Sequence, residues 1–504
     1  MRLAHLAVFS ILFLFLGEVS ANAEDGKEPR FMPSPGPYGV GFTTASLYDD
    51  SRPPAFKIDH VVQPTGRRIQ LLEWYPANTG GKEMSILDYL RIADSPPEAD
   101  WHRRDLPEEI SKGFASSKLP MLAKLDAPLK RERFPVLIYA PSLSATPVEN
   151  SDLCEFLASQ GYLVLASPSV GRNTRLMTDD VEGLKSQARD ITFLIDYARS
   201  QPNANMEAVA AIGYSWGGLA NIYAATQDRR IKALVSLDGS VRYYVSVAWD
   251  VGINPEQMTQ PLLIFTQGYI ALESDLVNAL ISKGRPSLLP SWKHADVYKI
   301  ELAAMEHSAF ASTNLRNDGF WDQGLAQPSY DRDEAKASFT ALARYTVGFL
   351  NSYLKHDASA ESFLKQTPTA NGVPKHMMYT DFSAATGLTP TLEALQTELE
   401  KRGFNQGSQI LSEAQAADHS FKVDEKALLA WGRGDLLDQG KLTEATEVFK
   451  LVVSMYPNSS TGYVSLADAY NRAGQKALAI ENFKKALQLD PQNYFVIDQL
   501  KALN

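Results

Sequence analysis

Short apolar runs alternate with longer amphipathic stretches over residues 36–365. The apolar runs are rich in branched and aromatic side chains and predict strands at residues 69–76, 135–140, 162–168, 208–214, 233–239, 261–268 and 297–305. Helical spacing is found between and after them, at residues 151–161, 183–201, 217–228 and 338–355. This alternation indicates an α/β domain, a mostly parallel sheet with helices on both faces, which the last helix closes.

One segment interrupts the alternation near the front of this domain. Within residues 82–130, only residues 83–93 have helical spacing, and the rest is charged and irregular. Two interpretations stand: the insertion covers a substrate cleft, or it packs on the surface of the domain. We prefer surface packing.

The C-terminal part has a different pattern, an internal repeat. Residues 442–459 and 476–493 superpose at an offset of 34 residues, which pairs Ala445 with Ala479 and Phe449 with Phe483. That period and pattern are typical of tetratricopeptide helix hairpins. Because two repeats are few, we expect residues 391–416 to add a third hairpin. A helical domain over 391–504 would thus follow a linker at 366–390. The repeats would either bind a protein or peptide partner or buttress the catalytic domain.

The N-terminus has the three-part pattern of a secretory signal. Arg2 precedes an apolar run over residues 6–16, and small residues end at Ala23, where we expect cleavage. The run is short for a membrane-spanning helix, and an uncleaved anchor is the alternative. The sequence predicts an exported protein, periplasmic or secreted from a bacterium. The mature chain would have no transmembrane segment and would begin with a flexible, proline-rich segment at residues 24–35.

Composition narrows the possible partners. The 504 residues carry a net charge of −10, which argues against a nucleic-acid partner. Cys154 is the one cysteine, so the sequence predicts no internal disulfide. No metal-ligand spacing occurs, and we expect neither a metal nor another cofactor.

The candidate chemistry begins in the sequence "AIGYSWGGLA", residues 211–220. Ser215 lies between Gly213 and Gly217 at the end of a predicted strand, as in a nucleophile elbow. An ordinary glycine-rich turn is the alternative, because the motif is short. A nucleophilic serine requires a base and an acid that orients the base, in the chain order serine, acid, histidine.

His307 is the histidine in the required position, directly after the last predicted strand. Three residues could supply the acid. Asp238 lies at the end of the predicted strand at residues 233–239, the first strand after Ser215. Glu273 and Asp275 follow the next predicted strand, at residues 261–268. We favour Asp238, because Asp275 lies at an apparent helix start, where an aspartate often complements the helix dipole. The oxyanion would be bound by the N–H group of Trp216 and by one from residues 139–147, for which Leu143 is the preferred donor.

With these residues placed, the chain resembles the plasma and intracellular type II platelet-activating-factor acetylhydrolases, within the dienelactone-hydrolase-like group. The resemblance covers about residues 36–355 and rests on "GPYGVGF", "FPVLIYAPSLSA", "LASQGYLVLASP", "GYSWGG", "LDG" and "HSAF". It implies an α/β-hydrolase fold, a triad of Ser215, Asp238 and His307, and an oxyanion hole from Leu143 and Trp216. Two features depart from that family: Pro141-Ser142 stands where His-Gly is common, and the repeats are foreign to the animal enzymes.

These observations predict a serine-dependent hydrolase that cleaves carboxylic esters, with short-acyl and lipid-like esters as the preferred substrates, through an acyl-enzyme. A second hypothesis is a hydrolase-like protein that has lost its activity and acts through protein interaction by its repeats. Removal of the Ser215 hydroxyl would abolish function under the first hypothesis and leave it intact under the second.

Overall fold

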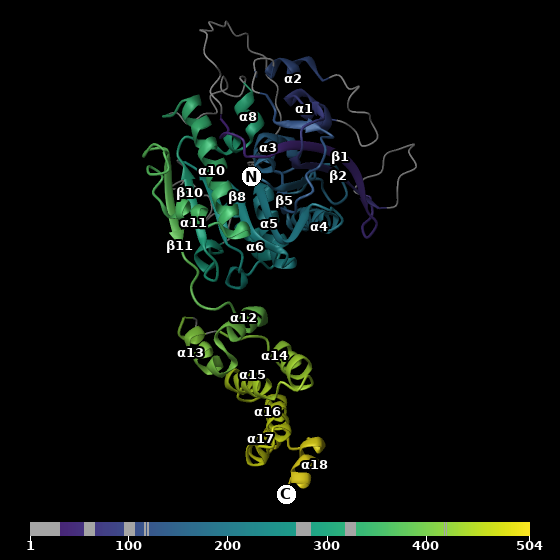
Figure 1. Ribbon diagram of the computed structural model, residues 1–504, viewed down its shortest axis with the longest axis vertical. Coiled ribbons are helices and arrows are strands. Elements are labelled where there is room, and N and C mark those ends of the chain that lie inside the picture. Colours follow the sequence, from purple (N-terminus) through teal and green to yellow (C-terminus); the bar gives the residue numbers. More distant parts are fainter. Residues whose placement is uncertain are drawn as a thin grey trace, which may run out of the picture. The chain divides into compact units, whose positions relative to one another are not determined.

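The computed structural model describes residues 31–54, 66–94, 106–114, 117, 120–268, 284–317, 329–417, 419 and 421–503. The chain divides into two compact units, which we describe separately (Figure 1). The first unit comprises most of the chain up to Ser383, and the second comprises Ala384–Asn504 with the short segments Pro255–Thr259 and Ser291–Ala295. The expected signal sequence and its cleavage site lie outside the described residues.

An eleven-stranded sheet, in the order β11-β10-β9-β8-β7-β5-β6-β2-β1-β4-β3, forms the centre of the described part of the first unit. Its middle is parallel and comprises β5 (Phe134–Ala140), β6 (Leu163–Ala166), β7 (Ala204–Tyr214), β8 (Ile231–Leu237), β9 (Leu262–Gln267) and β10 (Val297–Leu302). The outer strands are β1 (Gly39–Asp49), β2 (Arg67–Ala77), β3 (Lys82–Glu83), β4 (Ala123–Leu125) and β11 (Met378–Ser383). The predicted fold class, a mostly parallel α/β-hydrolase sheet, is confirmed.

Helices cover both faces of this sheet, which explains why the parallel strands are continuous apolar runs. Every residue of β5 and β6 is buried. On one face lie α3 (Ser151–Ser159) and α10 (Arg332–Lys355), and on the other α4 (Val181–Ala198) and α5 (Trp216–Gln227) (Figure 1). A capping box of Asp331 and Glu334 begins α10, and His356, in the left-handed region with φ 53°, ends it.

The described residues of the insertion pack against the sheet and α3. Helix α1 (Ile86–Asp94) carries Tyr89, which is fully buried. The indole N–H of Trp74 donates to the Tyr89 hydroxyl at 2.8 Å, and that hydroxyl donates to Glu155 at 2.7 Å. In addition, β4 pairs in parallel with β1. These contacts hold the described part of the insertion against the sheet and α3, and the choice between surface packing and a cover over a cleft stays a prediction.

Two expected boundaries differ from the structure. Phe31 is buried and lies edge-on to Phe339, with ring centroids 5.9 Å apart, so the segment expected to be flexible up to residue 35 is already packed at Phe31. Burying an aromatic ring outweighs the polar, proline-rich composition around it. The expected linker 366–390 contains β11, which pairs antiparallel with β10. Only the first residue of β11 is buried, so it has no apolar pattern to identify it.

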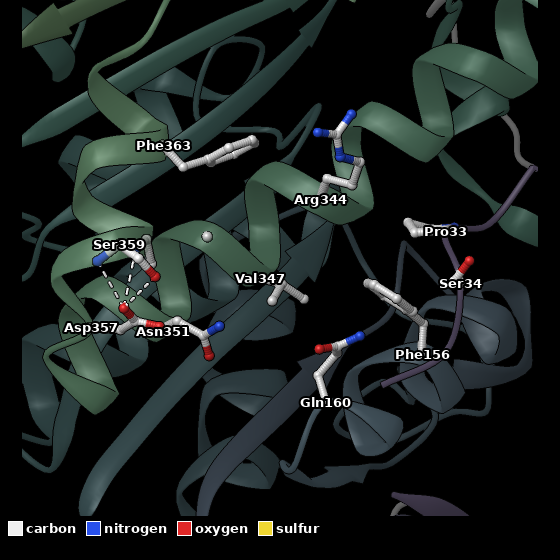
Figure 2. Close-up of a pocket in the computed structure, with 12 residues that line it drawn as sticks. Pro33, Ser34, Phe156, Gln160, Arg344, Val347, Asn351, Asp357, Ser359 and Phe363 are labelled. Carbon is white, nitrogen blue, oxygen red and sulfur yellow. Dashed lines mark hydrogen bonds between the residues drawn. The ribbon is translucent and has the colours of Figure 1, made fainter. Parts of the chain in front are cut away.

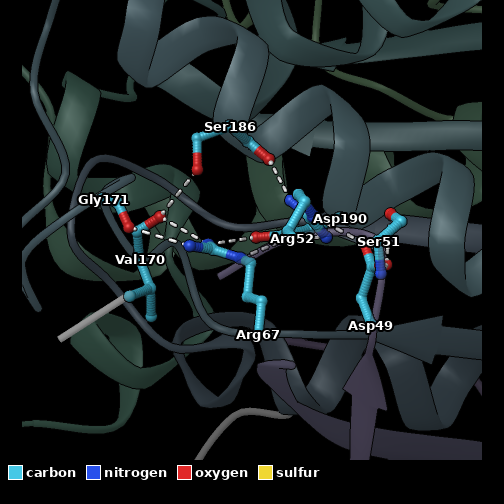
Figure 3. Close-up of polar contacts among 8 residues, drawn as sticks. All are labelled: Asp49, Ser51, Arg52, Arg67, Val170, Gly171, Ser186 and Asp190. Atoms are coloured by element: carbon cyan, nitrogen blue, oxygen red, sulfur yellow. Dashed lines mark hydrogen bonds and ion pairs between the residues drawn. The ribbon is translucent and has the colours of Figure 1, made fainter. Parts of the chain in front are cut away.

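A buried ion-pair network connects the β1–β2 hairpin with α4 and the loop after β6 (Figure 3). Arg67 binds Asp190 through Nε and Nη2 at 3.0 and 2.8 Å, and donates to the carbonyls of Val170 and Gly171 at 2.9 Å each. Arg52 also pairs with Asp190, at 2.8 Å. Because this geometry satisfies the buried charges mutually, the network fixes the chain at residues 170–171.

The second unit is helical in its described residues. Its helices are α12 (Leu392–Arg402), α13 (Gly407–Ala417), α14 (Glu425–Trp431), α15 (Leu442–Met455), α16 (Ser460–Arg472), α17 (Lys476–Leu489) and α18 (Tyr494–Leu503). The repeat-related residues Ala445, Phe449, Ala479 and Phe483 are all fully buried, as the period predicts. A π-helical turn, Gly432–Leu437, extends α14 in the first repeat. A Cβ at Gly432 would lie 2.6 Å from the Phe449 ring, so this glycine makes room for Phe449.

Within the described residues, every helix is too short or too polar to cross a lipid bilayer. The apolar run at residues 6–16 lies outside them.

Candidate active site

A sharp turn between β7 and α5 holds Ser215. β7 ends at Tyr214, α5 begins at Trp216, and Ser215 between them has φ 52° and ψ −118°. A Cβ at Gly213 would lie 2.3 Å from the backbone of Gly217, and one at Gly217 would lie 2.0 Å from the Ala140 carbonyl oxygen. Glycines are therefore required on both sides of the serine. This is the geometry of a nucleophile elbow, in which a strained turn exposes the hydroxyl.

Side chains from three strand ends meet at this turn. His307 begins the short helical turn His307–Phe310 after β10, and its Nε2 lies 3.0 Å from Ser215 Oγ. Its Nδ1 lies 2.6 Å from Oδ2 of Asp238, which directly follows β8 and is fully buried. With Nδ1–H donated to the carboxylate, Nε2 presents its lone pair to the serine hydroxyl. The structure thus brings together the three residues expected to form the triad; Glu273 and Asp275 lie outside the described residues.

Sequence reasoning missed the residues that hold this arrangement. Gln267, at the end of β9, donates its backbone N–H to Asp238 Oδ1 at 3.2 Å and accepts the backbone N–H of His307 on Oε1 at 2.9 Å. Its amide nitrogen donates to the Tyr243 hydroxyl at 2.8 Å. The Tyr214 hydroxyl donates to the His307 carbonyl at 2.8 Å. Gln267 stands at the end of β9, a strand end where side chains can reach the site, and this position is the signal that the sequence offers.

Burial and the charge of Asp238 keep the hydroxyl groups of the tyrosines around His307 protonated. Burial, together with the Asp238 carboxylate, raises the pKa of Tyr243 to about 12. The pKa of Tyr214 is raised well above its ordinary value, again mainly by burial. Both phenols therefore stay protonated at neutral pH, so the Tyr214 hydroxyl remains a donor to His307.

The two expected oxyanion donors lie on neighbouring elements. Trp216 is the first residue of α5, where a backbone N–H has no acceptor within the helix. The close approach of Gly217 to the Ala140 carbonyl brings this helix end against the turn after β5. In that turn the Ser142 N–H donates to Glu149 and the Ala145 N–H to the Ser142 carbonyl. The N–H groups of Leu143 and Ser144 lie between these two, and the role of the Leu143 N–H as the oxyanion donor stays a prediction.

A cavity of about 410 Å³ lies elsewhere on the first unit, along α10 and α11 (Ala358–Lys365). Figure 2 shows Phe156, Arg344 and Phe363 around it. None of the triad residues lines this cavity, so it is separate from the candidate site. Among the described residues, no group of three or more histidine, cysteine, aspartate or glutamate side chains is placed to bind a metal ion.

Two family models match the chain, one for a hydrolase and one for a helical repeat. Residues 114–341, which include Ser215, Asp238 and His307, match the family model "X-Pro dipeptidyl-peptidase (S15 family)". Residues 460–493, which span α16 and α17, match the tetratricopeptide repeat model. A solved ferulic acid esterase from Streptomyces cinnamoneus is similar at 17% identity and a TM-score of 0.47, over 68% of this chain and 96% of that one.

The family match supports a hydrolase that uses a serine nucleophile, and the repeat match confirms a tetratricopeptide region. The resemblance to platelet-activating-factor acetylhydrolases stays a prediction, because the matched family is a different one.

Proposed function

We propose that the protein is an exported serine hydrolase that cleaves carboxylic esters with short acyl groups through an acyl-enzyme. The observation that carries the proposal is the continuous hydrogen-bonded chain from Ser215 Oγ through His307 to Asp238, with distances of 3.0 and 2.6 Å. A serine hydroxyl is a weak nucleophile unless an oriented base takes its proton, and this chain supplies that base.

The chemistry follows from the positions of these groups. As Ser215 Oγ attacks the acyl carbon, His307 Nε2 takes the hydroxyl proton, and Asp238 stabilises the resulting imidazolium. The N–H groups of Leu143 and Trp216 would bind the oxyanion, a contribution of about 3 kcal/mol per donor in related sites. His307 then protonates the departing alcohol. Water attacks the acyl-enzyme with His307 as base, which releases the acid and restores Ser215.

Amides pass through the same intermediates, and the name of the matched family includes a dipeptidyl-peptidase. Cleavage after an X-Pro dipeptide is therefore the second candidate activity. The hypothesis of a lapsed enzyme is weakened by the intact contacts of the triad, since a serine without function has no reason to stay paired with its base. The repeat region supports an additional protein or peptide partner.

The test compares residues 24–504 with the Ser215→Ala variant. We expect the parent to hydrolyse p-nitrophenyl acetate and butyrate faster than the octanoate, and the variant to lose at least about 1,000-fold in kcat. An alanyl-prolyl p-nitroanilide tests the peptidase alternative, and faster cleavage of it would replace the ester proposal. The lapsed enzyme would be favoured if the parent and Ser215→Ala are both folded, neither hydrolyses any of these substrates, and a fluorophosphonate does not label Ser215 in the parent.

Export is a separate part of the proposal, supported by the sequence pattern that ends at Ala23. N-terminal sequencing of the protein from a bacterial periplasm or medium should begin at Glu24. An uncleaved N-terminus in the membrane fraction would contradict export of a soluble enzyme.

A further inference from the structure

The turn after β5 is held on both sides of Leu143. Its Ser142 donates to the half-buried Glu149 carboxylate twice, from the backbone N–H to Oε1 at 2.8 Å and from Oγ to Oε2 at 2.7 Å. On the other side Ser144, in the left-handed region with φ 60°, accepts the Met177 N–H on Oγ at 2.8 Å. Leu143 therefore lies between two anchored serines, and the geometry of its N–H depends on both.

Glu149 is itself fixed from the β5 side and from the segment after His307. The Tyr139 hydroxyl, near the end of β5, donates to Glu149 Oε1 at 2.9 Å. The adjacent Asn150 donates to the same hydroxyl at 2.8 Å and accepts the Ser312 N–H at 2.9 Å. The hydroxyl of Ser312 also donates to the Glu149 carbonyl at 3.2 Å. The short helix Pro147–Asn150 thus connects the turn with the chain that carries His307.

We propose that Glu149 is a positioning residue for the oxyanion hole, whose side chain holds Ser142 so that the Leu143 N–H faces the developing oxyanion. This inference rests on the proposed function, because it assigns the turn a task in acyl transfer. It also explains Pro141-Ser142: proline leaves no N–H to satisfy at position 141, and serine supplies the second donor to Glu149 that glycine lacks. The Pro141 carbonyl is held separately by Gln187 Nε2 at 2.9 Å.

The contacts predict which substitutions are tolerated. In Glu149→Gln the amide oxygen can replace Oε1 and accept from both the Ser142 N–H and Tyr139, while the Ser142 hydroxyl turns to accept from the amide nitrogen. The turn then stays in place. Glu149→Ala removes all three contacts and leaves the Ser142 N–H without an acceptor. The Ser142→Ala variant removes only the hydroxyl contact.

The experiment measures ester hydrolysis and hydrogen–deuterium exchange of residues 141–145. For Glu149→Ala we expect kcat to fall about 10- to 100-fold with KM changed less than about threefold, since an oxyanion donor acts in the transition state. Exchange over the turn should rise about 10-fold or more. Glu149→Gln should keep kcat within about threefold, and Ser142→Ala should lie between the two.

Glu155 provides the matched control. It is fully buried, whereas Glu149 is half-buried, and like Glu149 it accepts from a tyrosine, here Tyr89, and from a backbone N–H, that of Leu122 at 2.6 Å. Its contacts join the insertion to α3, so Glu155→Ala should lower the melting temperature and leave kcat of the folded fraction unchanged. An equal loss of kcat in both alanine variants would reduce Glu149 to a general structural role and overturn the proposal.

Hydrogen–deuterium exchange tests the role of Glu149 independently of the proposed function. If the parent protein hydrolyses no ester, the function fails, yet exchange still reports whether Glu149 holds the turn. Unchanged exchange in Glu149→Ala overturns the proposal whatever the activity. If that variant does not fold, Ser142→Ala carries the same test, and its unchanged exchange and kcat would overturn the proposal as well.

Discussion

At the scale of single residues, Gln267 contacts both partners of Ser215 in the candidate triad. Its backbone bonds to Asp238, and its side chain bonds to the backbone of His307 and to Tyr243. A methionine has a similar shape and keeps the backbone bond, but its thioether sulfur is only a weak acceptor for the His307 N–H. We expect Gln267→Met to lower kcat about 10-fold with little change in KM, because the base is held less well when it takes the proton.

Steady-state hydrolysis of p-nitrophenyl acetate measures this effect. Gln227→Met, at an exposed position at the end of α5, is the control and should behave as the parent does. If Gln267→Met keeps the parental kcat, the bond between Gln267 and His307 does not position the base.

At the scale of elements, the close contact between α5 and β5 determines where the nucleophile lies. Ala at position 217 would bring its Cβ within 2.0 Å of the Ala140 carbonyl oxygen, and backbone atoms would have to shift. We expect Gly217→Ala to destabilise the first unit by about 3 kcal/mol and to abolish fluorophosphonate labelling of Ser215. Thermal melting and labelling check this expectation, with Thr226→Ala in the last turn of α5 as the control. Parental labelling and melting of Gly217→Ala would show that the helix end moves freely.

The burial of each element explains whether the sequence could predict it. The parallel strands were found because helices bury both of their faces, which leaves continuous apolar runs such as β5. In contrast, β1 and β11 were missed because much of each is exposed and neither alternates regularly. Ser215, Asp238 and His307 were found from a motif and from strand ends. Gln267 and Glu149 were not, since polar residues that act through backbone contacts leave no periodic pattern.

At the scale of the whole molecule, the two units have separate cores and a different content of buried carboxylates. Burial raises the pKa of Glu73, Glu149 and Glu155 to about 7 each, and all three lie in the first unit. Among the described carboxylates of the second unit, Glu413 shows a clear shift, and its pKa is lowered by its bond to Arg402. The pH dependence of stability should therefore differ between the units.

The direction in which the free energy of unfolding changes with pH follows from proton binding. Between the ordinary glutamate pKa of 4.5 and the folded value of about 7, the folded first unit binds more protons than the unfolded chain. Its free energy of unfolding must then fall as the pH rises through this window, by roughly 1–3 kcal/mol per group. Calorimetry of the full chain between pH 5 and 8 should show the transition of the first unit moving to lower temperature, while that of the second stays nearly constant. Glu73→Gln, whose side chain still accepts from Tyr197, should reduce this slope by about a third. A first-unit transition that rises in temperature with pH would mean that these carboxylates stay ionised in the fold.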